Sequence, residues 1–252
     1  MRRTRNSQIL RSKLTGHQSC NAASGMIGRL GIIMVIDERM GVFIDSMDKG
    51  NSPFLDEIEK QAIETQVPVI RKSTQSLLKF LLAYAKPRNI LEVGTAIGFS
   101  ALLMSEYGPK DCHITTIEKY DKRIPIAREN FKKNGREEKI TLLEGDAADI
   151  LKGLEGAYDM IFMDAAKGQY IHFLPEALRL LAPGGLLLSD NVLQDGDVIE
   201  SRFAVTRRNR TIHARMRDYL YELKHMPGLE TVILPVGDGV ALTTKTGLED
   251  RG

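Results

Sequence analysis

The sequence predicts an α/β fold, with a mostly parallel seven-stranded sheet, one antiparallel edge strand and helices on both faces. After Pro87, short apolar or β-branched segments alternate with longer helical ones, which is typical of βαβ units. Gly237-Asp238-Gly239 joins two strand-like segments and predicts a hairpin, which supplies the antiparallel strand. The strand-like segments end in glycine or polar residues, as expected where a parallel sheet binds a ligand at its carboxyl ends.

Residues 34–86 are predicted to form helices that pack on the core. Pro53 suits the first turn of a helix that Asn51 or Ser52 can cap, and apolar residues recur at helical spacing after it. A second helix is predicted to end before Pro87, because proline disfavours the helical conformation at the residue before it.

Residues 87–246 carry the alternating pattern and form the predicted main domain, followed by a tail at 247–252. The predicted strands are residues 90–93, 113–118, 139–146, 158–164, 186–191, 231–236 and 239–245. The predicted helices between them are residues 99–107, 122–134, 170–181 and 198–225.

The composition is that of an ordinary globular protein. The chain has 252 residues, of which 42% are hydrophobic and 27% charged, and it is long enough to bury a sizeable core. No apolar segment approaches the roughly 18 residues that a membrane span needs, so we expect no membrane association. Cys20 and Cys112 lie far apart and show no metal-ligand spacing, which favours free thiols and a cytoplasmic location.

The basic residues are unevenly distributed. Residues 1–33 carry six Lys or Arg and no acid, although the whole chain has a net charge of only +2. This segment lacks the apolar centre of a secretory signal, and we predict a disordered basic extension. Two alternatives stay open: translation could begin at Met34, or the segment could be a basic tail that binds nucleic acid.

The turn after the first predicted strand is rich in glycine. It reads G-x-x-x-G at Gly94 and Gly98, with Ala96 where a dinucleotide-binding turn would have a middle glycine. No Gly-Lys-Ser or Gly-Lys-Thr follows, which excludes a phosphate-binding P-loop. Glu118 ends the second strand, where a carboxylate can accept both hydroxyls of a ribose. The pattern favours a ligand with a nucleoside part and no pyrophosphate.

These segments together resemble the cation-dependent O-methyltransferases, a family that includes catechol and caffeoyl-CoA O-methyltransferases. The resemblance covers residues 50–245 and rests on five segments in the family's order and spacing: ILEVGTAIGFSALLMS, TTIEK, LLEGDA, FMDAAKGQY and LLLSDN. It implies a Rossmann-like class I methyltransferase fold over residues 87–246 and S-adenosylmethionine as the cofactor. The cofactor-binding residues that it implies are Ile70, Glu92, Gly94, Ser100, Glu118, Gly145, Asp146, Ala147 and Asp164.

The resemblance also places a divalent cation, Mg²⁺, at Asp164, Asp190 and Asn191. Two carboxylates and an amide oxygen are the hard donors that magnesium prefers, and they leave positions for two adjacent oxygens of a substrate. Lys167 follows Asp164 by three residues, and close to a dication its ammonium form is disfavoured. We therefore predict that Lys167 is the general base for a substrate hydroxyl, with Asp164 as the second catalytic residue.

The predicted helix at 198–225 bears on the substrate. Its basic residues suggest a phosphate-binding surface, with a solvated amphipathic helix as the plain alternative. Residues 202–225, with the segments RKSTQSLLKFLL and LPVGDGVALTTK, resemble the bacterial tRNA 5-hydroxyuridine methyltransferases more than the plant or animal catechol enzymes of the family. That resemblance implies a tRNA anticodon loop as partner and conversion of 5-hydroxyuridine at the wobble position 34 to 5-methoxyuridine. The predicted tRNA-binding residues are Arg207, Arg208, Arg210, Arg217 and Lys224.

Two other functions remain as alternatives. A small-molecule methyltransferase of the catechol or caffeoyl-CoA type would use the same site, since a catechol also presents two adjacent oxygens. A non-catalytic RNA-binding protein that kept the fold belongs to a different class, and it would not need Lys167 or Asp190. The family likeness also implies a homodimer, formed through the helices at 34–65.

Overall fold

A computed structural model describes residues 38–246. The predicted basic extension at 1–33 and the predicted tail at 247–252 lie outside the described residues. None of the helices in the described part of the chain is long and apolar enough to cross a membrane.

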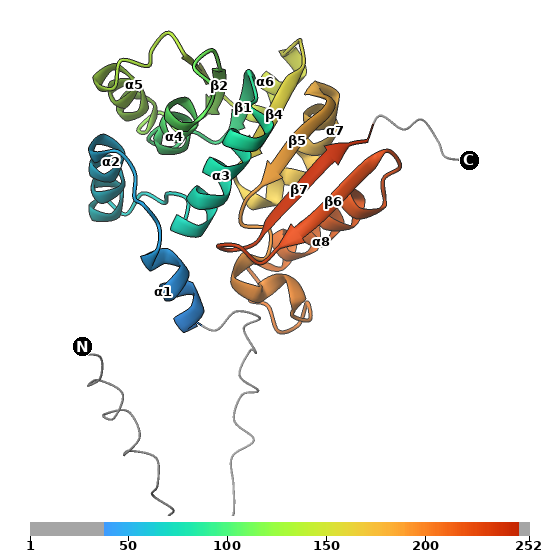
Figure 1. Cartoon of the computed structure of the whole chain (residues 1–252). Coiled ribbons are helices and arrows are strands. Elements are labelled where there is room, and N and C mark those ends of the chain that lie inside the picture. The colour runs from blue at the N-terminus through green and yellow to red at the C-terminus, as the bar shows by residue number, and fades with distance from the viewer. Residues whose placement is uncertain (1–37, 247–252) are drawn as a thin grey trace, which may run out of the picture. The chain divides into compact units, whose positions relative to one another are not determined.

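The described chain is built on one seven-stranded sheet in the order β3-β2-β1-β4-β5-β7-β6 (Figure 1). The strands are β1 Asn89–Val93, β2 His113–Glu118, β3 Ile140–Glu144, β4 Tyr158–Met163, β5 Leu181–Ser189, β6 Leu229–Leu234 and β7 Val240–Lys245. β1 to β5 pair in parallel, whereas β7 is antiparallel to both of its neighbours. The predicted fold class is confirmed, and the antiparallel strand lies one place in from the edge, with β6 outside it.

Helices cover both faces of this sheet. They are α1 Glu38–Ser46, α2 Pro53–Glu64, α3 Lys72–Ala85, α4 Phe99–Tyr107, α5 Ile124–Lys133, α6 Ala147–Gly153, α7 Tyr170–Leu180 and α8 Arg210–His225, with the short 3₁₀ helices η1 Lys167–Gln169 and η2 Gln194–Ile199. Buried residues of α2 to α5 share one apolar cluster with Ile90 and Phe162, and those of α6 to α8 share another with Leu91 and Ile161. Side chains alternate across a strand, so adjacent strand residues fill the two opposite cores.

The strand order places a switch point between β1 and β4. From β1 the chain proceeds outward to β2 and β3, and β4 then begins on the other side of β1. In such sheets the connections leave the two neighbouring strands toward opposite faces, and a crevice opens at their carboxyl ends. The turn after β1 and the segment after β4 therefore border the same space.

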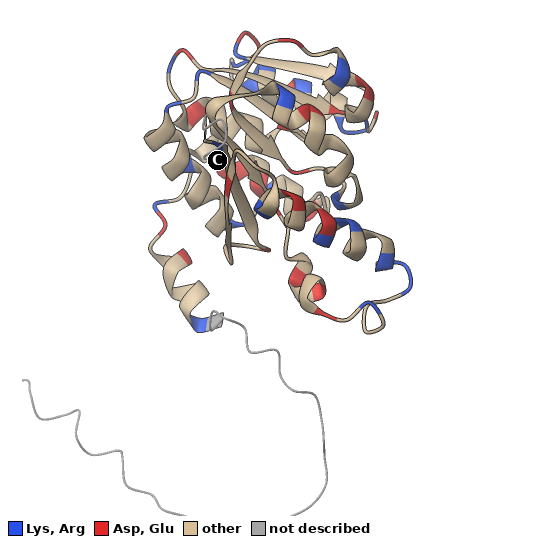
Figure 2. Cartoon of the chain, turned by 90° about the vertical axis from the view of Figure 1, so that its right-hand side faces the viewer, with Lys and Arg blue, Asp and Glu red and all other residues tan. Residues whose placement is uncertain are grey.

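The region before α8 differs from the prediction. A helix was expected over 198–225, but α8 begins at Arg210, and residues 200–209 form turns after η2. Ile199 and Phe203 are 72% and 86% exposed, so they supply no buried stripe to hold a helix there, whereas such a stripe starts at His213. Figure 2 shows blue Lys and Arg positions on α8 and on the loop that precedes it.

Two smaller differences concern short elements. α6 was not predicted, because its seven residues are too few to show a helical period; Asp146 caps it by accepting from the Ala148 amide at 2.9 Å. β5 begins at Leu181, five residues before the predicted start, and its pairing with β4 is irregular between Tyr158 and Met160.

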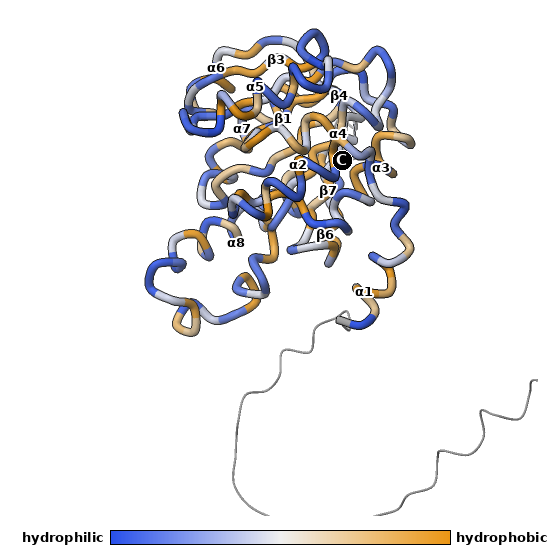
Figure 3. The backbone as a smooth tube through the Cα atoms, turned by 90° about the vertical axis from the view of Figure 1, so that its left-hand side faces the viewer, coloured by the Kyte–Doolittle hydropathy of each residue, from blue (hydrophilic) through white to orange (hydrophobic). Residues whose placement is uncertain are grey.

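α1 exposes an apolar surface. Figure 3 shows hydrophobic positions in orange along this helix. The side chains that are at least half exposed there and just after it are Met40, Val42, Phe43, Ile44 and Met47. A contiguous exposed apolar surface of this kind marks an interaction site more often than a solvated helix face.

Candidate active site

A cavity of about 990 Å³ lies at the carboxyl ends of the parallel strands. Ten of the predicted site residues line it: Ile70, Gly94, Ser100, Glu118, Gly145, Asp146, Ala147, Asp164, Lys167 and Asn191. Glu92 and Asp190 do not line it, and both are almost fully buried. The structure thus gathers residues from all five parallel strands and from the segment before α3 around one space.

The turn after β1 needs glycine at its first position. Gly94 has φ +105°, and a Cβ there would lie 2.2 Å from the carbonyl oxygen of Asp164. Ala96 also adopts a left-handed conformation, with φ +47°, and its amide donates to Glu118 Oε2 at 2.7 Å. A left-handed non-glycine residue costs about 1–2 kcal/mol, so this hydrogen bond offsets part of the strain.

Glu118 is held by backbone donors. Besides the Ala96 amide, the amides of Lys119 and Tyr120 donate to its Oε1 at 3.0 and 2.9 Å. A carboxylate offers about four acceptor positions, so this side chain, which lines the cavity, retains capacity for a ligand hydroxyl on Oε2. The predicted ribose-binding role is compatible with this geometry.

Glu92 lies beneath the cavity. The hydroxyls of Ser100 and Thr116 donate to its two carboxylate oxygens. Complete burial raises the pKa of Glu92 to about 7; the two hydroxyl donors lower it, while the nearby carboxylate of Asp164 raises it further. Glu92 therefore holds Ser100, which does line the cavity, and does not itself face the cavity.

We expect Glu92→Gln to change how stability depends on pH. The pKa of Glu92 in the folded chain, about 7, lies above its ordinary value of 4.5. The folded state therefore binds the Glu92 proton more tightly than the unfolded state does. The contribution of this proton to the free energy of unfolding is full below pH 4.5 and is lost as the pH rises to 7. In urea unfolding, the free energy of unfolding of the variant should rise by about 3 kcal/mol relative to that of the wild type between pH 5 and pH 8. Parallel pH profiles of the two proteins would contradict this assignment.

Asp164 and Asp190 follow adjacent strands at the same level. Met163 and Ser189, the last residues of β4 and β5, pair in register, and the Asp190 amide donates to the Met163 carbonyl at 3.0 Å. The hydroxyl of Tyr170, which is fully buried in α7, lies 3.1 Å from the carbonyl oxygens of both Met163 and Asp190. Tyr170, which the sequence analysis did not single out, therefore ties the two strand ends together from below.

The carboxyl groups of Asp164 and Asp190 are both at least partly buried, and their negative charges repel each other. Burial raises the pKa of Asp164 to about 7, and the Asp190 carboxyl adds to this, while Lys167 opposes it. Burial likewise raises the pKa of Asp190 to about 6, opposed by the Asn191 amide, which donates to Oδ1 at 2.8 Å. A positive ion between these strand ends would relieve both the burial and the mutual repulsion.

The donors suit a hard cation. In residues 38–246, no three His, Cys, Asp or Glu side chains are placed to share a metal ion, so a cation here would depend on two carboxylates and the amide of Asn191. Asn191 has φ +58° and faces the cavity. An all-oxygen set with open positions fits Mg²⁺ and disfavours the softer metals that prefer sulfur or imidazole. The predicted ligands thus fit the predicted ion.

Lys167, the first residue of η1, lines the cavity and pairs with Asp238, which the sequence analysis had assigned only to a turn. Its Nζ donates to Asp238 Oδ2 at 3.2 Å. Asp238 sits in the connection between β6 and β7 and lines the same cavity. The Gly-Asp-Gly sequence is explained by the hairpin alone, so it gave no reason to expect a contact with Lys167.

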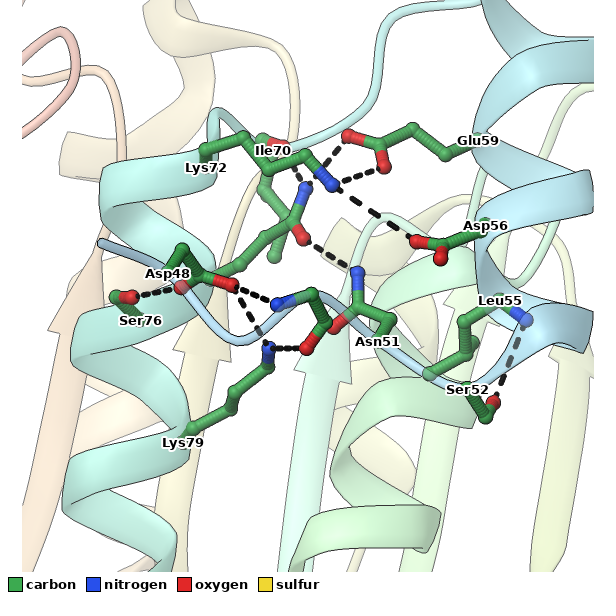
Figure 4. A network of polar contacts seen from close by, with 12 residues as sticks. Asp48, Asn51, Ser52, Leu55, Asp56, Glu59, Ile70, Lys72, Ser76 and Lys79 are labelled. Atoms are coloured by element: carbon green, nitrogen blue, oxygen red, sulfur yellow. Dashed lines mark hydrogen bonds and ion pairs between the residues drawn. The ribbon is translucent and has the colours of Figure 1, made fainter. Parts of the chain in front are cut away.

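Ile70 forms the wall opposite the strand ends, and a polar network holds its backbone (Figure 4). Gln75 Nε2 donates to the Ile70 carbonyl at 2.9 Å and to Glu59 Oε1 at 3.0 Å. Asn51 Nδ2 donates to Gln75 Oε1 at 2.9 Å. α2 and α3 are thereby connected to the cavity wall through one buried glutamine.

The predicted tRNA-binding residues do not line the cavity, and they fall into two groups. Arg210, Arg217 and Lys224 each donate to a backbone carbonyl, those of Val205, Val198 and Thr231 respectively. Arg207 and Arg208 are exposed in the turns before α8. The three residues that bond to the backbone therefore have a structural role, which the sequence pattern did not reveal. Arg207 and Arg208 do not make these contacts.

The strand order, the switch-point cavity and the glycine turn define a doubly wound α/β protein with a ligand site at the carboxyl ends of its strands. The model of the O-methyltransferase family matches residues 45–246. The chain belongs to this O-methyltransferase family.

Relatives with curated names agree. The chain is 37% identical over 143 residues to a catechol O-methyltransferase of Niastella koreensis, covering 54% of this chain and 65% of that protein, slightly under two thirds. It is 32% identical over 179 residues to caffeoyl-CoA O-methyltransferase 2 of Populus trichocarpa, covering 66% of this chain and 70% of the relative. The SAH-bound structure of the Podospora anserina methyltransferase PaMTH1 superposes with a TM-score of 0.76 at 29% identity, over 86% of this chain and 99% of that one.

Proposed function

We propose that this chain is an S-adenosylmethionine-dependent O-methyltransferase that acts on a small aromatic substrate with two adjacent oxygens, as in a catechol, with a divalent cation at its site. One observation carries the proposal: the glycine turn after β1, Asp164 after β4 and Asn191 after β5 border the same cavity. The names of the catechol and caffeoyl-CoA relatives and the SAH-bound neighbour support it. At about 990 Å³ the cavity has room for a cofactor and a second small molecule.

The cofactor end of the cavity lies at β1 to β3. Gly94 and Ser100 border the part where the methionine moiety would bind, and Glu118 would accept a ribose hydroxyl. Gly145, Ala147 and the capping residue Asp146 line the part of the cavity where the adenine would bind. Ile70, an apolar residue, lines the same cavity.

The acceptor end lies at β4 and β5. Asp164, Asp190 and Asn191 would hold the cation, whose Lewis acidity makes a substrate hydroxyl easier to deprotonate. Lys167 would take the hydroxyl proton on Nζ, leaving the substrate oxygen as the nucleophile for the methyl group. Holding the two reactants in one cavity contributes to the rate because it removes the entropy of their encounter.

The test is methyl transfer with purified protein, S-adenosylmethionine, Mg²⁺ and a panel of catechols, beside matched phenols with a single hydroxyl. We expect mass spectrometry to show a gain of one methyl group on the catechols and none on the phenols. Equal methylation of both sets would contradict the need for two adjacent oxygens, and methylation of neither would contradict the proposed substrate class.

A second candidate substrate is the one predicted from the sequence: 5-hydroxyuridine at the wobble position of tRNA. Its 5-hydroxyl neighbours the 4-oxo group, so it presents the same pair of oxygens. The supporting observation is that Arg207 and Arg208 are exposed in the turns before α8, in the segment that follows the cavity-lining Asp195 in the chain. Exposed cations beside a cavity can bind the phosphates of a strand whose base enters it.

We expect the double variant Arg207→Glu and Arg208→Glu to separate the two substrates. If tRNA binds here, the KM for tRNA should rise at least about tenfold, because two attractive charges become repulsive, while catechol turnover stays unchanged. The matched control reverses Lys132 and Lys133, which are exposed on α5 at the opposite edge of the sheet. Equal losses on tRNA and catechol, or equal effects of both double variants, would contradict a tRNA-binding role.

The remaining alternatives are tested by the same material. A non-catalytic RNA-binding protein would bind tRNA equally well with and without Lys167, and would methylate neither substrate. The expected homodimer is supported by the exposed apolar surface of α1, since burying it between two copies removes it from water. Light scattering of the wild type beside Phe43→Asp measures this directly, and two monomers would contradict it.

A further inference from the structure

Asp238 is a buried charge in a place where a plain hairpin needs none. Its side chain is 4% exposed, and it lines the cavity beside Lys167. A carboxylate at such a position is costly unless its oxygens are satisfied by donors or by an opposite charge. The partners of its two oxygens therefore indicate what it is there to hold.

Each oxygen of Asp238 has one partner. Oδ1 accepts from the backbone amide of Asp195, and Oδ2 accepts from Lys167 Nζ at 3.2 Å. The first partner belongs to the main chain and positions the carboxylate. The second is the amine of the proposed base, and its side chain is 34% exposed, so it would otherwise be free to turn toward solvent.

The turn that carries Asp238 is fixed on both sides. Gly237 has φ +60°, and a Cβ there would lie 2.6 Å from Thr74 Oγ1; Gly239 has φ +83°, and a Cβ there would lie 2.2 Å from Leu193 Cγ. The amide of Leu193 also donates to the Asp238 carbonyl at 2.9 Å. The turn is therefore packed between α3 and the segment after β5, and the carboxylate has little freedom to follow Lys167 if the lysine moves.

We propose that Asp238 is the positioning residue of Lys167. It holds Nζ inside the cavity, and it stabilises the ammonium formed when Lys167 accepts the hydroxyl proton. The proton passes from the substrate oxygen to Nζ and stays there, the new positive charge lies beside the Asp238 carboxylate, and the oxygen keeps the electron pair. The inference rests on the proposed function, because it assigns a purpose to the base of that reaction.

The arrangement has a physical rationale. A base that becomes charged during the reaction works best when a fixed third group orients it and carries the opposite charge. A cation held by Asp164 and Asp190 would repel an ammonium, and the fixed Asp238 carboxylate in contact with Nζ counters this repulsion. Lys167 interacts with both sides: its charge lowers the pKa of Asp164, and its Nζ donates to Asp238 Oδ2 at 3.2 Å.

The test is Asp238→Asn, which keeps the shape and removes the charge. We expect kcat to fall on the order of 10- to 100-fold, the loss of one charge-assisted hydrogen bond, with the KM for catechol and the Kd for S-adenosylmethionine within about twofold. Asp238→Glu, which keeps the charge, should recover part of kcat. Asp218→Asn, the same change at an exposed position of α8, is the matched control.

A double-variant cycle separates positioning from a structural role. In a Lys167→Met background, Asp238→Asn should cause no further loss, because the group that it positions is gone. A further loss of the same size in that background, full activity of Asp238→Asn, or no recovery in Asp238→Glu would each overturn the inference. Wild-type protein that methylates no catechol would overturn the proposed function, and the inference with it. Thermal melting of each variant identifies loss of folding; if Asp238→Asn does not fold, the cycle with Asp238→Glu decides.

Discussion

Lys167→Met is expected to lower kcat by about 10²–10⁴-fold, the usual contribution of a positioned general base. Methionine keeps much of the apolar stem, so the cavity wall is retained while the amine is lost. The Kd for S-adenosylmethionine, measured by calorimetry, should stay within about twofold, because Lys167 is not among the predicted cofactor-binding residues, most of which belong to or follow β1 to β3.

The control for this experiment is Lys119→Met, which also removes an ammonium from the cavity wall, but at the cofactor end, where Lys119 pairs with Asp146 at 3.3 Å. That change should raise the Kd for the cofactor more than it lowers kcat. A Lys167→Met protein that turns over catechol at the wild-type rate would show that the proton leaves by another route.

Removal of divalent cations should abolish turnover. We expect activity in excess EDTA to fall at least about 10³-fold and to return when Mg²⁺ is added in excess, because the Lewis acid lowers the activation barrier by several kcal/mol. Asp190→Asn should show the same loss with Mg²⁺ present, since it removes one of the two carboxylates proposed to hold the cation. Undiminished turnover in EDTA would contradict the cation assignment.

The same variant has a second readout that does not depend on activity. Burial and the Asp190 charge both raise the pKa of Asp164, so the two carboxyl groups oppose each other in the metal-free protein. Asp190→Asn should therefore raise the melting temperature in EDTA while removing the stabilisation that Mg²⁺ gives the wild type. A wild type whose melting temperature does not respond to Mg²⁺ would argue against binding at this site.

The fold could be predicted because the chain signals it locally. Apolar strands that alternate with helices leave few topologies for a parallel sheet, and their ends must meet at one edge. For this reason Asp164, Asp190 and Asn191 were correctly expected at neighbouring strand ends, and the structure pairs the preceding residues in register.

The features that were missed depend on contacts between distant segments. The bond of Asp238 to Lys167 spans 71 residues, and the buried hydroxyl of Tyr170 meets carbonyls of two different strands. Neither leaves a period or a spacing in the sequence. The first part of the predicted helix at 198–225 failed for a related reason: composition suggested helix, but among residues 200–209 only Val205 is buried, which is too little packing to hold a helix.

The contact between Gly94 and the main chain of Asp164 leaves no room for even one methyl group. The distance between the turn after β1 and the segment after β4 is therefore set by direct contact between their main chains, and not by a side chain. If the cofactor and the acceptor bind as proposed, a side chain larger than glycine at position 94 would push these two parts of the cavity apart and lengthen the path of the methyl group.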